Sequence, residues 1–412
     1  MLVLAGGDLV LPNGILTGAS LVIEGGRIAA IEPTSRTDVG GATVVDTREC
    51  YVVPGFIDVH VHGVEGHDTL DPGEPVAAIA SRLSRYGVTA FCPTTVACAP
   101  RELSGVLAQV ARARATRPPR SARVLPAHLE SNFINPAYAG AQPAECIRLP
   151  AHVADGMPDA SSGVAHARAR DGEFTARDIL DVVAAARPDV GIVTLAPELP
   201  GGLELVRRLV SAGHRVSLGH SGASVDEAMA AIDAGAQHAT HLFNRMAPMT
   251  HRAPGIAGAV LAREEVAAEL ICDGYHVHPA MSRIAIAAKG RDRLMAITDG
   301  TAGSGLARGA TARLGGRQIR VTDSAAVLDD GTLAGSTLTM DRAFKTIVKT
   351  FGFSPVDAAI LCSTTPAREL GLTGFGVLAR DCVADIAVLH RGFGVVRTFV
   401  AGEQVFAAEG VT

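Results

Sequence analysis

Eight short apolar runs in the middle of the chain, each followed by a stretch with helical character, constrain the fold most strongly. They read GFIDVHVHG, VTAFCPTT, RVLPAHLESNF, VGIVTLAPE, HRVSLGHSG, QHATHLFN, VAAELICDG and RLMAITDG. Strands that alternate with helices form parallel βαβ units, and eight such units close into a (β/α)8 barrel. The sequence therefore predicts an α/β protein whose main domain is a TIM-type barrel.

Two of the intervening segments carry clear helix signals. In SVDEAMAAIDAG, Ser224 can cap the first turn, and apolar residues recur near the helical period. In ELVRRLVSAGH, Gly213 stands where a helix would end. We expect both segments to be barrel helices.

The two ends of the chain have a different pattern. Residues 1–53 alternate apolar and polar residues with NG and GG at the bends, and DIAVLHRGFGVVRTFVAGEQVF near the C-terminus has the same character. This pattern is typical of short antiparallel strands, and the termini of a domain commonly lie close together. We therefore expect residues 1–53 and 374–412 to form a small β-sandwich domain and residues 54–373 to form the barrel domain.

The composition excludes several classes of partner. With 412 residues and a formal net charge of -5, the chain lacks the basic character of nucleic-acid-binding proteins. No uninterrupted apolar stretch reaches membrane-spanning length, and the start carries no basic segment typical of a signal peptide. The seven cysteines are odd in number and form no C-x-x-C motif, which favours buried thiols in a reducing compartment. We expect a cytoplasmic protein with no nucleic-acid or membrane partner.

The eight runs end in polar residues with unusual regularity. Because side chains two apart in a strand point the same way, the two histidines of DVHVHG should converge. In (β/α)8 barrels the C-terminal ends of the strands form the active-site face. Seven runs end in a potential metal ligand or acid, and one ends in a threonine: His60 and His62, Thr94, Glu130, Glu198, His220, His241, Asp273 and Asp299.

Imidazole and carboxylate groups at this face indicate metal chemistry. They are ligands for zinc and its neighbours, and catalytic sites keep one position open for water. Glu130, His220 and His241 are expected to form one site, and a second would combine His60 and His62 with Asp299 while sharing Glu130.

In such a site, metal-activated water would attack a carbonyl. Asp299 would take the proton of this water and pass it to a leaving nitrogen. Glu198 has no partner histidine and is interpreted as structural, and Asp273 is expected to orient a neighbour.

The motifs in this order resemble the amidohydrolase superfamily, and most closely its N-acetylglucosamine-6-phosphate deacetylase family. They are the HxH of VVPGFIDVHVHG, the HLE of the third run, SLGHS, ATHLFN, CDGYHVHP and ITDG. The resemblance covers nearly the whole chain, including its β-rich ends. It implies a metal-dependent deacetylase that converts N-acetylglucosamine 6-phosphate to glucosamine 6-phosphate and acetate.

The resemblance also implies roles for individual residues. Asp299 matches the catalytic aspartate, and Glu130, His220 and His241 match the metal ligands. Family members with HxH in the first strand can hold a second metal, so the pair at His60 and His62 allows one or two ions. Zinc, iron, cobalt and manganese all suit these donors.

Substrate contacts follow from the same resemblance. Arg252 in THRAPG matches the phosphate-binding arginine of the family, and its planar fork suits two phosphate oxygens. Related deacetylases are dimers or larger and complete the phosphate site across the interface, which implies a homo-oligomer. Further substrate-binding candidates are Asn244, Arg245, His276, Leu333, Ala334 and Gly335.

Two departures from the family pattern leave the substrate open. Gln142 stands where the family has a histidine that polarises the scissile carbonyl, so it is a further substrate-binding candidate. Its amide can donate a hydrogen bond to a carbonyl oxygen but cannot titrate near neutral pH. Ser131 and Asn132 replace a glycine-proline pair beside the expected bridging carboxylate. Another N-acetyl amino sugar or an N-acyl amino acid remains an alternative substrate, and with the latter Arg252 would face a carboxylate.

Two further classes of protein are disfavoured. A cyclic-amide hydrolase of the dihydroorotase kind would bridge its metals with a carboxylated lysine on strand 4, but no lysine precedes Lys289. A non-catalytic sugar-phosphate binding protein would need neither Asp299 nor the set of metal ligands. The sequence therefore favours an enzyme.

Overall fold

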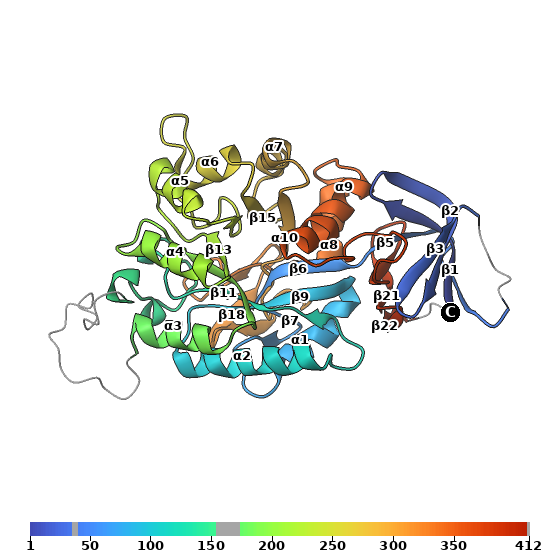
Figure 1. The fold of residues 1–412 in the computed structure, drawn as a ribbon, viewed down its shortest axis with the longest axis horizontal. Coiled ribbons are helices and arrows are strands. Elements are labelled where there is room, and N and C mark those ends of the chain that lie inside the picture. Colours follow the sequence, from blue (N-terminus) through green and yellow to red (C-terminus); the bar gives the residue numbers. More distant parts are fainter. Residues whose placement is uncertain (35–39, 154–173, 410–412) are drawn as a thin grey trace.

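The computed structural model describes residues 1–34, 40–153 and 174–409. Its centre is a parallel barrel built from the eight predicted runs (Figure 1). Hydrogen bonds from the Asp299 amide to the His60 carbonyl (2.9 Å) and from the His62 amide to the Gly300 carbonyl (2.8 Å) join the last strand to the first. The predicted barrel is confirmed. Its strands are β6 (Phe56–Val61), β9 (Val88–Thr95), β11 (Ala127–Glu130), β12 (Val190–Leu195), β13 (Arg215–Leu218), β14 (His238–Ala239), β15 (Ala267–Ile271) and β16 (Leu294–Ile297).

The third run departs from a single strand. It divides into β10 (Arg123–Val124), which pairs with β9, and β11, which pairs with both β9 and β12. Pro126 lies between the two pieces and has no amide hydrogen for a ladder bond. The break places Glu130 at the end of a short, fully buried strand.

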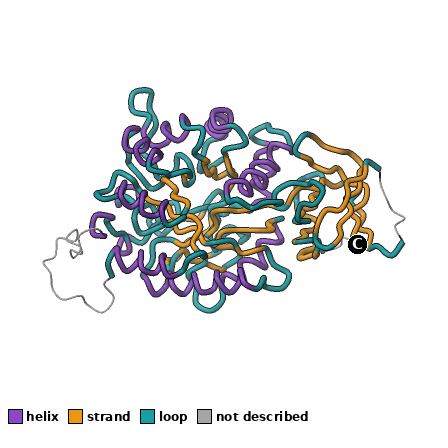
Figure 2. The backbone as a smooth tube through the Cα atoms, in the orientation of Figure 1, coloured by secondary structure: helices purple, strands orange, loops and turns teal. Residues whose placement is uncertain are grey.

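A helix follows each barrel strand and packs on the outside of the barrel (Figure 2). Two short helices, α9 (Pro355–Ala359) and α10 (Thr365–Glu369), then lead toward the C-terminal strands. The eight barrel helices are α1 (Pro75–Leu83), α2 (Pro100–Ala115), α3 (Ala176–Ala185), α4 (Gly202–Ser211), α5 (Val225–Asp233), α6 (Gly255–Ala262), α7 (Pro279–Lys289) and α8 (Met340–Lys349).

The helix signals in the sequence act as predicted. The Ser224 hydroxyl accepts a hydrogen bond from the Glu227 amide (3.3 Å), and the Glu227 carboxylate accepts one from the Ser224 amide (2.8 Å). This reciprocal pair satisfies donors at the start of α5 that have no partner within the helix. Helix α4 ends at Ser211, and Gly213 takes a φ of +84°, which suits a residue without a Cβ.

The two ends of the chain join in one continuous eight-stranded sheet, at the right of Figure 1. Strand β5 pairs antiparallel with β20 and so links the N-terminal to the C-terminal strands. The sheet has its own apolar core, which includes Leu4, Leu21 and Phe399. The predicted union of the two β-rich ends is confirmed, and the boundaries at residues 53 and 374 stay a prediction. The strands are β1 (Leu2–Leu11), β2 (Gly14–Glu24), β3 (Arg27–Glu32), β4 (Thr43–Asp46), β5 (Cys50–Pro54), β20 (Ile386–His390), β21 (Val395–Val400) and β22 (Glu403–Ala407).

A small three-stranded sheet between β16 and α8 was not foreseen from the sequence. It contains β17 (Thr311–Leu314), β18 (Arg317–Val321) and β19 (Ala326–Val327), and a second short pair, β7 (Gly63–Val64) and β8 (His67–Asp68), follows the first barrel strand. Leu314 and Ile319 pack with Val96 in a separate apolar cluster. The three-stranded sheet thereby brings Leu314 to the mouth of the barrel.

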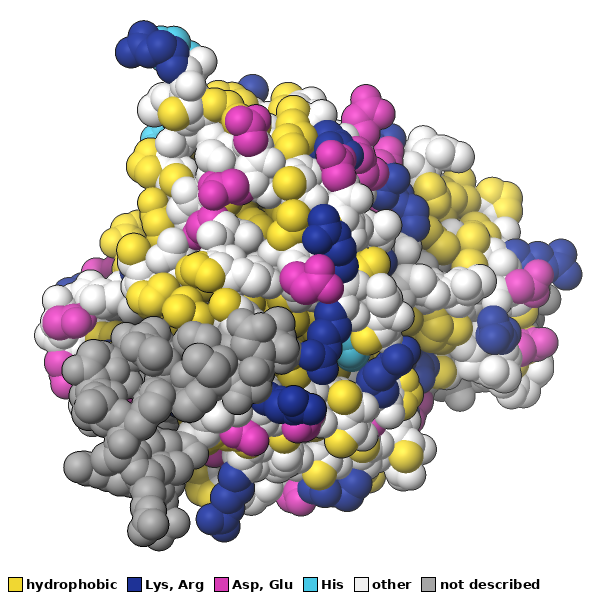
Figure 3. Space-filling view, turned by 60° about the vertical axis from the view of Figure 1, so that its left-hand side comes forward, with side chains coloured by type: hydrophobic (Ala, Val, Ile, Leu, Met, Phe, Trp, Pro, Cys, Tyr) yellow, Lys and Arg dark blue, Asp and Glu magenta, His cyan; other side chains and the backbone are white. Residues whose placement is uncertain are grey.

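The surface agrees with the charge expected from the sequence. Acidic and basic side chains both occur across the face in Figure 3, without one extended region of a single sign. Within the described ranges, no helix has the length and apolar character required to cross a membrane. All seven cysteines are free thiols.

Candidate active site

A cavity of about 560 Å³ lies at the C-terminal ends of the barrel strands. Most residues predicted for the site line it, so the topology gathers side chains that are far apart in the sequence. His60 is fully buried beside it, Ala334 is fully buried, and Arg252 is exposed and does not line it. The predicted residues that line the cavity are His62, Glu130, Gln142, His220, His241, Asn244, Arg245, His276, Asp299, Leu333 and Gly335.

The first predicted metal site has its donor atoms together. Glu130 ends β11, and its Oε1 lies 2.8 Å from the Nε2 of His220 and 2.9 Å from the Nε2 of His241. The two Nε2 atoms are 3.1 Å apart. Two nitrogens that each lie about 2.0–2.1 Å from one zinc ion would be separated by about 3.0–3.4 Å. The three side chains therefore fit a single divalent ion.

The second predicted group lies directly beside the first. The Nε2 atoms of His60 and His62 are 3.2 Å apart, and the Nε2 of His62 is 3.5 Å from Oε2 of Glu130. Oδ1 of Asp299 lies 3.4 Å and 3.3 Å from the two histidine nitrogens. Glu130 thus lies between both groups, as a shared carboxylate would.

Contacts on the far side of one imidazole determine which nitrogen faces the cavity. The Nδ1 of His220 donates to the carbonyl of Tyr138 at 2.8 Å. A carbonyl can only accept, so this contact leaves Nε2 as the nitrogen that can bind a metal. The buried Nδ1 atoms of His62 and His241 have no hydrogen-bond partner among the described residues.

Three of the strand-end residues adopt a backbone conformation that is uncommon outside glycine. The φ angles of His220, His241 and Asp299 are +48°, +29° and +47°. Such conformations persist only where the surrounding structure compensates for the strain, and they cluster at functional sites. Gly335 has a φ of +60°, and a Cβ there would lie 2.8 Å from the main-chain oxygen of Asp299. Only glycine therefore suits this position beside Asp299.

The buried histidines and carboxylates of the site shift one another's pKa values toward the charged forms. Burial alone would lower the pKa of His60, but the negative charges of Glu269 and Asp299 raise it to about 10. Burial would raise the pKa of Glu130, yet His220 and its neighbouring histidines hold it well below its usual range. Asp299 is likewise buried, and the two histidines of β6 keep its pKa low. Both carboxylates are therefore ionised at neutral pH.

The side chains that depart from the family pattern make hydrogen bonds within the protein. The Gln142 amide donates to Oε2 of Glu130, and its oxygen accepts from the Ala97 amide at 2.7 Å. The side chains of Ser131 and Asn132 are buried and donate to main-chain carbonyls. Gln142 therefore holds the carboxylate that lies between the two histidine groups.

On another wall of the cavity, Asp273 and His276 form a pair. The Nδ1 of His276 lies 2.6 Å from Oδ2 of Asp273, which confirms that Asp273 orients a neighbour. Burial acts to lower the pKa of His276, but the hydrogen bond to Asp273 raises it. Its buried Nε2 has no hydrogen-bond partner within the described part of the chain. This nitrogen lies close to the main chain of Gly335, on the wall of the cavity that also carries Asp299.

Two other charged residues lie away from the cavity. The exposed Arg252 contacts the Nε2 of His251 at 2.9 Å, in the loop that precedes α6. Glu198 accepts hydrogen bonds from the Ser221 hydroxyl and the Gly222 amide, both at 2.7 Å. This confirms its structural interpretation, because these bonds anchor the segment that follows His220.

Sequence reasoning missed a layer of polar residues inside the barrel. Glu269 in β15 lies 2.8 Å from the Nδ1 of His60 and 2.8 Å from the Nε2 of His238, and His128 lies close by. All four side chains are fully buried. The available signal was a glutamate between apolar residues in the middle of the run VAAELICDG.

The chain is similar to known proteins over nearly its whole length. The model of the amidohydrolase family matches residues 51–405. An N-acetylgalactosamine-6-phosphate deacetylase of Escherichia coli O157:H7 is 33% identical over 398 residues, which are 96% of this chain and 97% of the relative. An N-acetylglucosamine-6-phosphate deacetylase of Bacillus subtilis (strain 168) is 31% identical over 411 residues, covering 97% and 96%.

A solved structure is similar over the whole chain. It is a mutant N-acetyl-D-glucosamine-6-phosphate deacetylase from Mycobacterium smegmatis in complex with N-acetyl-D-glucosamine-6-phosphate. The TM-score is 0.84 at 30% sequence identity, and the match covers 98% of this chain and 99% of the other. The similarity therefore includes the end sheet as well as the barrel.

Proposed function

The chain belongs to the amidohydrolase family, and from this premise we propose that it hydrolyses the N-acetyl group of an amino-sugar 6-phosphate. The first candidate substrate is N-acetylglucosamine 6-phosphate, with glucosamine 6-phosphate and acetate as products. One observation carries the proposal: Glu130, His220, His241 and Asp299 converge in a single cavity at the active-site end of the barrel. The activities named for the relatives support the same substrate class.

The family implies a divalent metal, and two groups of side chains suit it. We assign Glu130, His220 and His241 to one ion and His60 with His62 to a second, with Glu130 shared. Zinc is the first candidate, and iron, cobalt and manganese accept the same donors. When bound, such an ion supplies Lewis acidity, which activates water and polarises the amide carbonyl.

Asp299 is assigned as the base and then the acid of the reaction. Its ionised carboxylate takes a proton from the attacking water and returns it to the leaving nitrogen as the carbon–nitrogen bond breaks. Acetate and the free amine are then released. Gln142 is assigned a supporting role, since its amide group donates to Glu130 and holds the carboxylate in place.

Sugar and phosphate contacts come from the remaining residues of the cavity. We assign them to Asn244, Arg245 and His276, together with Leu333 and Gly335, which flank the buried Ala334 beside Asp299. Arg252 is exposed and outside the cavity of its own chain, so we propose that it reaches the cavity of a second subunit in a homodimer or larger oligomer.

Arg252→Ala tests this assignment of the arginine. It should raise KM for the phosphorylated sugar and leave KM for the unphosphorylated sugar unchanged, because only the former presents a phosphate to the guanidinium. Light scattering on the parent protein reports the oligomeric state. A monomer with unimpaired activity would refute the role across an interface.

A second candidate substrate is N-acetylgalactosamine 6-phosphate. The Escherichia coli relative is named for it, and Gln142 marks a departure from the family pattern beside the metal candidates. An N-acyl amino acid is a further alternative, in which Arg252 would bind a carboxylate. We also propose a cytoplasmic location, which suits seven free cysteines.

The deciding experiment measures turnover by purified, metal-loaded protein, with the metal counted on the same sample. The compounds are N-acetylglucosamine 6-phosphate, its galactosamine isomer, both unphosphorylated sugars and an N-acetyl amino acid. Activity confined to a phosphorylated sugar is the expected result. Bound metal with activity only on unphosphorylated compounds would keep the hydrolase but refute the phosphate site.

A further inference from the structure

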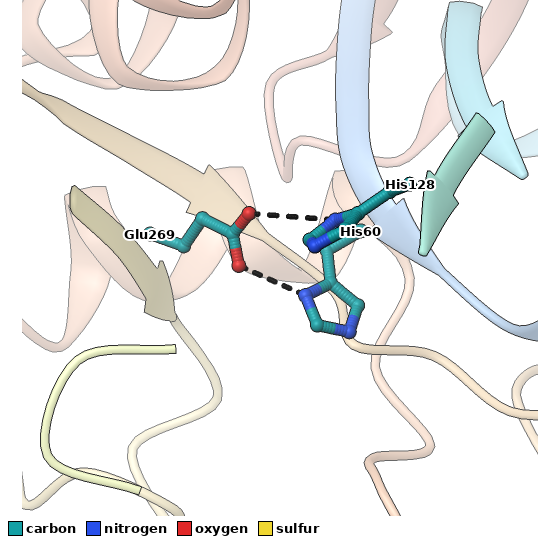
Figure 4. A group of neighbouring side chains, drawn as sticks. All are labelled: His60, His128 and Glu269. Atoms are coloured by element: carbon teal, nitrogen blue, oxygen red, sulfur yellow. Dashed lines mark hydrogen bonds and ion pairs between the residues drawn. The ribbon is translucent and has the colours of Figure 1, made fainter. Parts of the chain in front are cut away.

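A carboxylate beneath the candidate metal ligands has no part in the chemistry described so far. Glu269 lies in β15 and points into the barrel toward His60 and His128, as Figure 4 shows. It has no exposed surface, and neither do the two histidines. An ionised carboxylate is costly to bury unless it is paired and fully hydrogen-bonded. Its presence in an apolar strand therefore calls for a specific role.

The contacts of Glu269 reach histidines of both candidate metal groups. Its Oε2 lies 2.8 Å from the Nδ1 of His60 and accepts a hydrogen bond from the main-chain amide of His241 at 3.2 Å. Its Oε1 lies 2.8 Å from the Nε2 of His238. One buried carboxylate thus holds the ring of a histidine on the first strand and the backbone of another after the sixth.

The group His60, His128 and Glu269 is compact enough to suggest a further metal site, but the hydrogen bonds argue against it. The Nδ1 of His128 lies 3.0 Å from the carbonyl of Val59, which can only accept. That nitrogen therefore carries a proton and has no lone pair for a metal. The Nε2 of His128 is engaged by the Thr194 hydroxyl at 2.8 Å. Glu269 is therefore placed to orient a ligand.

We propose that Glu269 is a positioning residue that fixes the orientation of His60 and thereby equips the barrel for a second metal ion. Because an ionised carboxylate only accepts, the Nδ1 of His60 donates to it, and Nε2 is the nitrogen that gives up its proton when it binds a metal. That Nε2 faces the Nε2 of His62 at 3.2 Å. The inference rests on the proposed function only in taking His60 and His62 as metal ligands.

The test uses Glu269→Gln, His60→Gln and the double variant. A glutamine keeps the size of the side chain but places an NH₂ group where one of the two carboxylate oxygens now accepts hydrogen bonds. Bound metal is counted by elemental mass spectrometry, and the dissociation constant of the weaker ion is measured by competition with a chelator. We expect the parent to bind two ions and Glu269→Gln to bind the second ion about 10- to 100-fold more weakly, as for other outer-shell partners.

The double variant distinguishes orientation of His60 from general damage. In the His60→Gln background, adding Glu269→Gln should change the remaining affinity for the second ion by less than about threefold. This follows because Glu269 is proposed to act on the ion only through His60, which is then absent. An equal loss in both backgrounds would overturn the proposal. So would a Glu269→Gln protein that binds both ions as tightly as the parent, or a parent that binds only one.

Two further measurements keep the test valid if Glu269→Gln folds poorly. Glu369→Gln makes the same change at a buried glutamate paired with Arg293 outside the site, and it should keep both ions. In zinc-loaded parent protein with ¹⁵N-labelled histidine, the His60 signal should report a protonated Nδ1 and a metal-bound Nε2. A metal-bound Nδ1 would overturn the proposal without any variant at Glu269. Turnover with a single ion would leave the proposed deacetylation intact, so the two failures are distinguishable.

Discussion

Asp299→Asn should abolish turnover and leave the substrate and the ion at Glu130, His220 and His241 bound. The Oδ1 atom of Asp299 lines the cavity 3.4 Å and 3.3 Å from the Nε2 atoms of His60 and His62, and its pKa is kept low, so it is ionised and placed to accept a proton. Asparagine has the same shape but cannot take or return a proton. General acid–base catalysis contributes about 10²–10⁴ in rate, and one carboxylate here serves both transfers.

We therefore expect kcat to fall by about 10³–10⁴, which corresponds to about 4–5.5 kcal/mol in the activation free energy. The assay follows acetate release from N-acetylglucosamine 6-phosphate, with metal content and substrate affinity measured on the same preparation. Asp385→Asn is the matched control, since Asp385 is buried at the junction of barrel and end sheet and pairs with Arg123 at 3.2 Å. It should keep kcat within about threefold. Turnover by Asp299→Asn within tenfold of the parent, or a loss that tracks its metal content, would refute the assigned role.

Three other changes have defined outcomes. Glu130→Gln should remove metal together with activity, because the charge shared by both histidine groups is lost; full metal content on elemental analysis would contradict this. Burial raises the pKa of Asp68 from 3.8 to about 6, so the unfolded chain loses its proton at lower pH than the folded protein, and the free energy of unfolding falls by about 2 kcal/mol as pH rises from 4 to 6. In Asp68→Asn the free energy of unfolding, measured with urea, should depend less on pH between about pH 4 and 6. A pH dependence equal to that of the parent would show that Asp68 does not contribute it. Ser224→Ala should destabilise the protein by about 1 kcal/mol through loss of the α5 cap, while Ser224→Asp retains most of the stability; equal melting temperatures would exclude this contribution.

The parts of this fold that the sequence predicted are those encoded locally. A strand and its helix are read from the period of apolar residues, and Ser224 or Gly213 marks a helix end through chemistry within one turn. Strand ends are local features too, so Glu130 and His220 could be placed at the active-site face before any contact was known. The small sheet that carries Leu314 to the cavity was missed because its strands are short.

Arg252 shows a different limit of prediction from the sequence. Its residue type and neighbours match a phosphate-binding segment, yet the side chain is exposed and lies outside the cavity of its own chain. The position of an exposed loop depends on what it packs against, and the local pattern of residues does not show contacts with a second subunit. For such a residue, the sequence can predict the ligand that its side chain would bind but not the position of the side chain in the fold.

The pair of histidines in DVHVHG shows why the number of metal ions is not decided by that motif alone. The alternation of a strand makes His60 and His62 point the same way, but it leaves the rotation of each ring open. For His60 that rotation is set by Glu269, which lies in β15, two strands away from β6 around the barrel. Which interior side chains meet across a barrel depends on strand register, which no local pattern encodes. We therefore expect any capacity for a second ion in this chain to depend on a carboxylate in the seventh strand as much as on the histidines of the first.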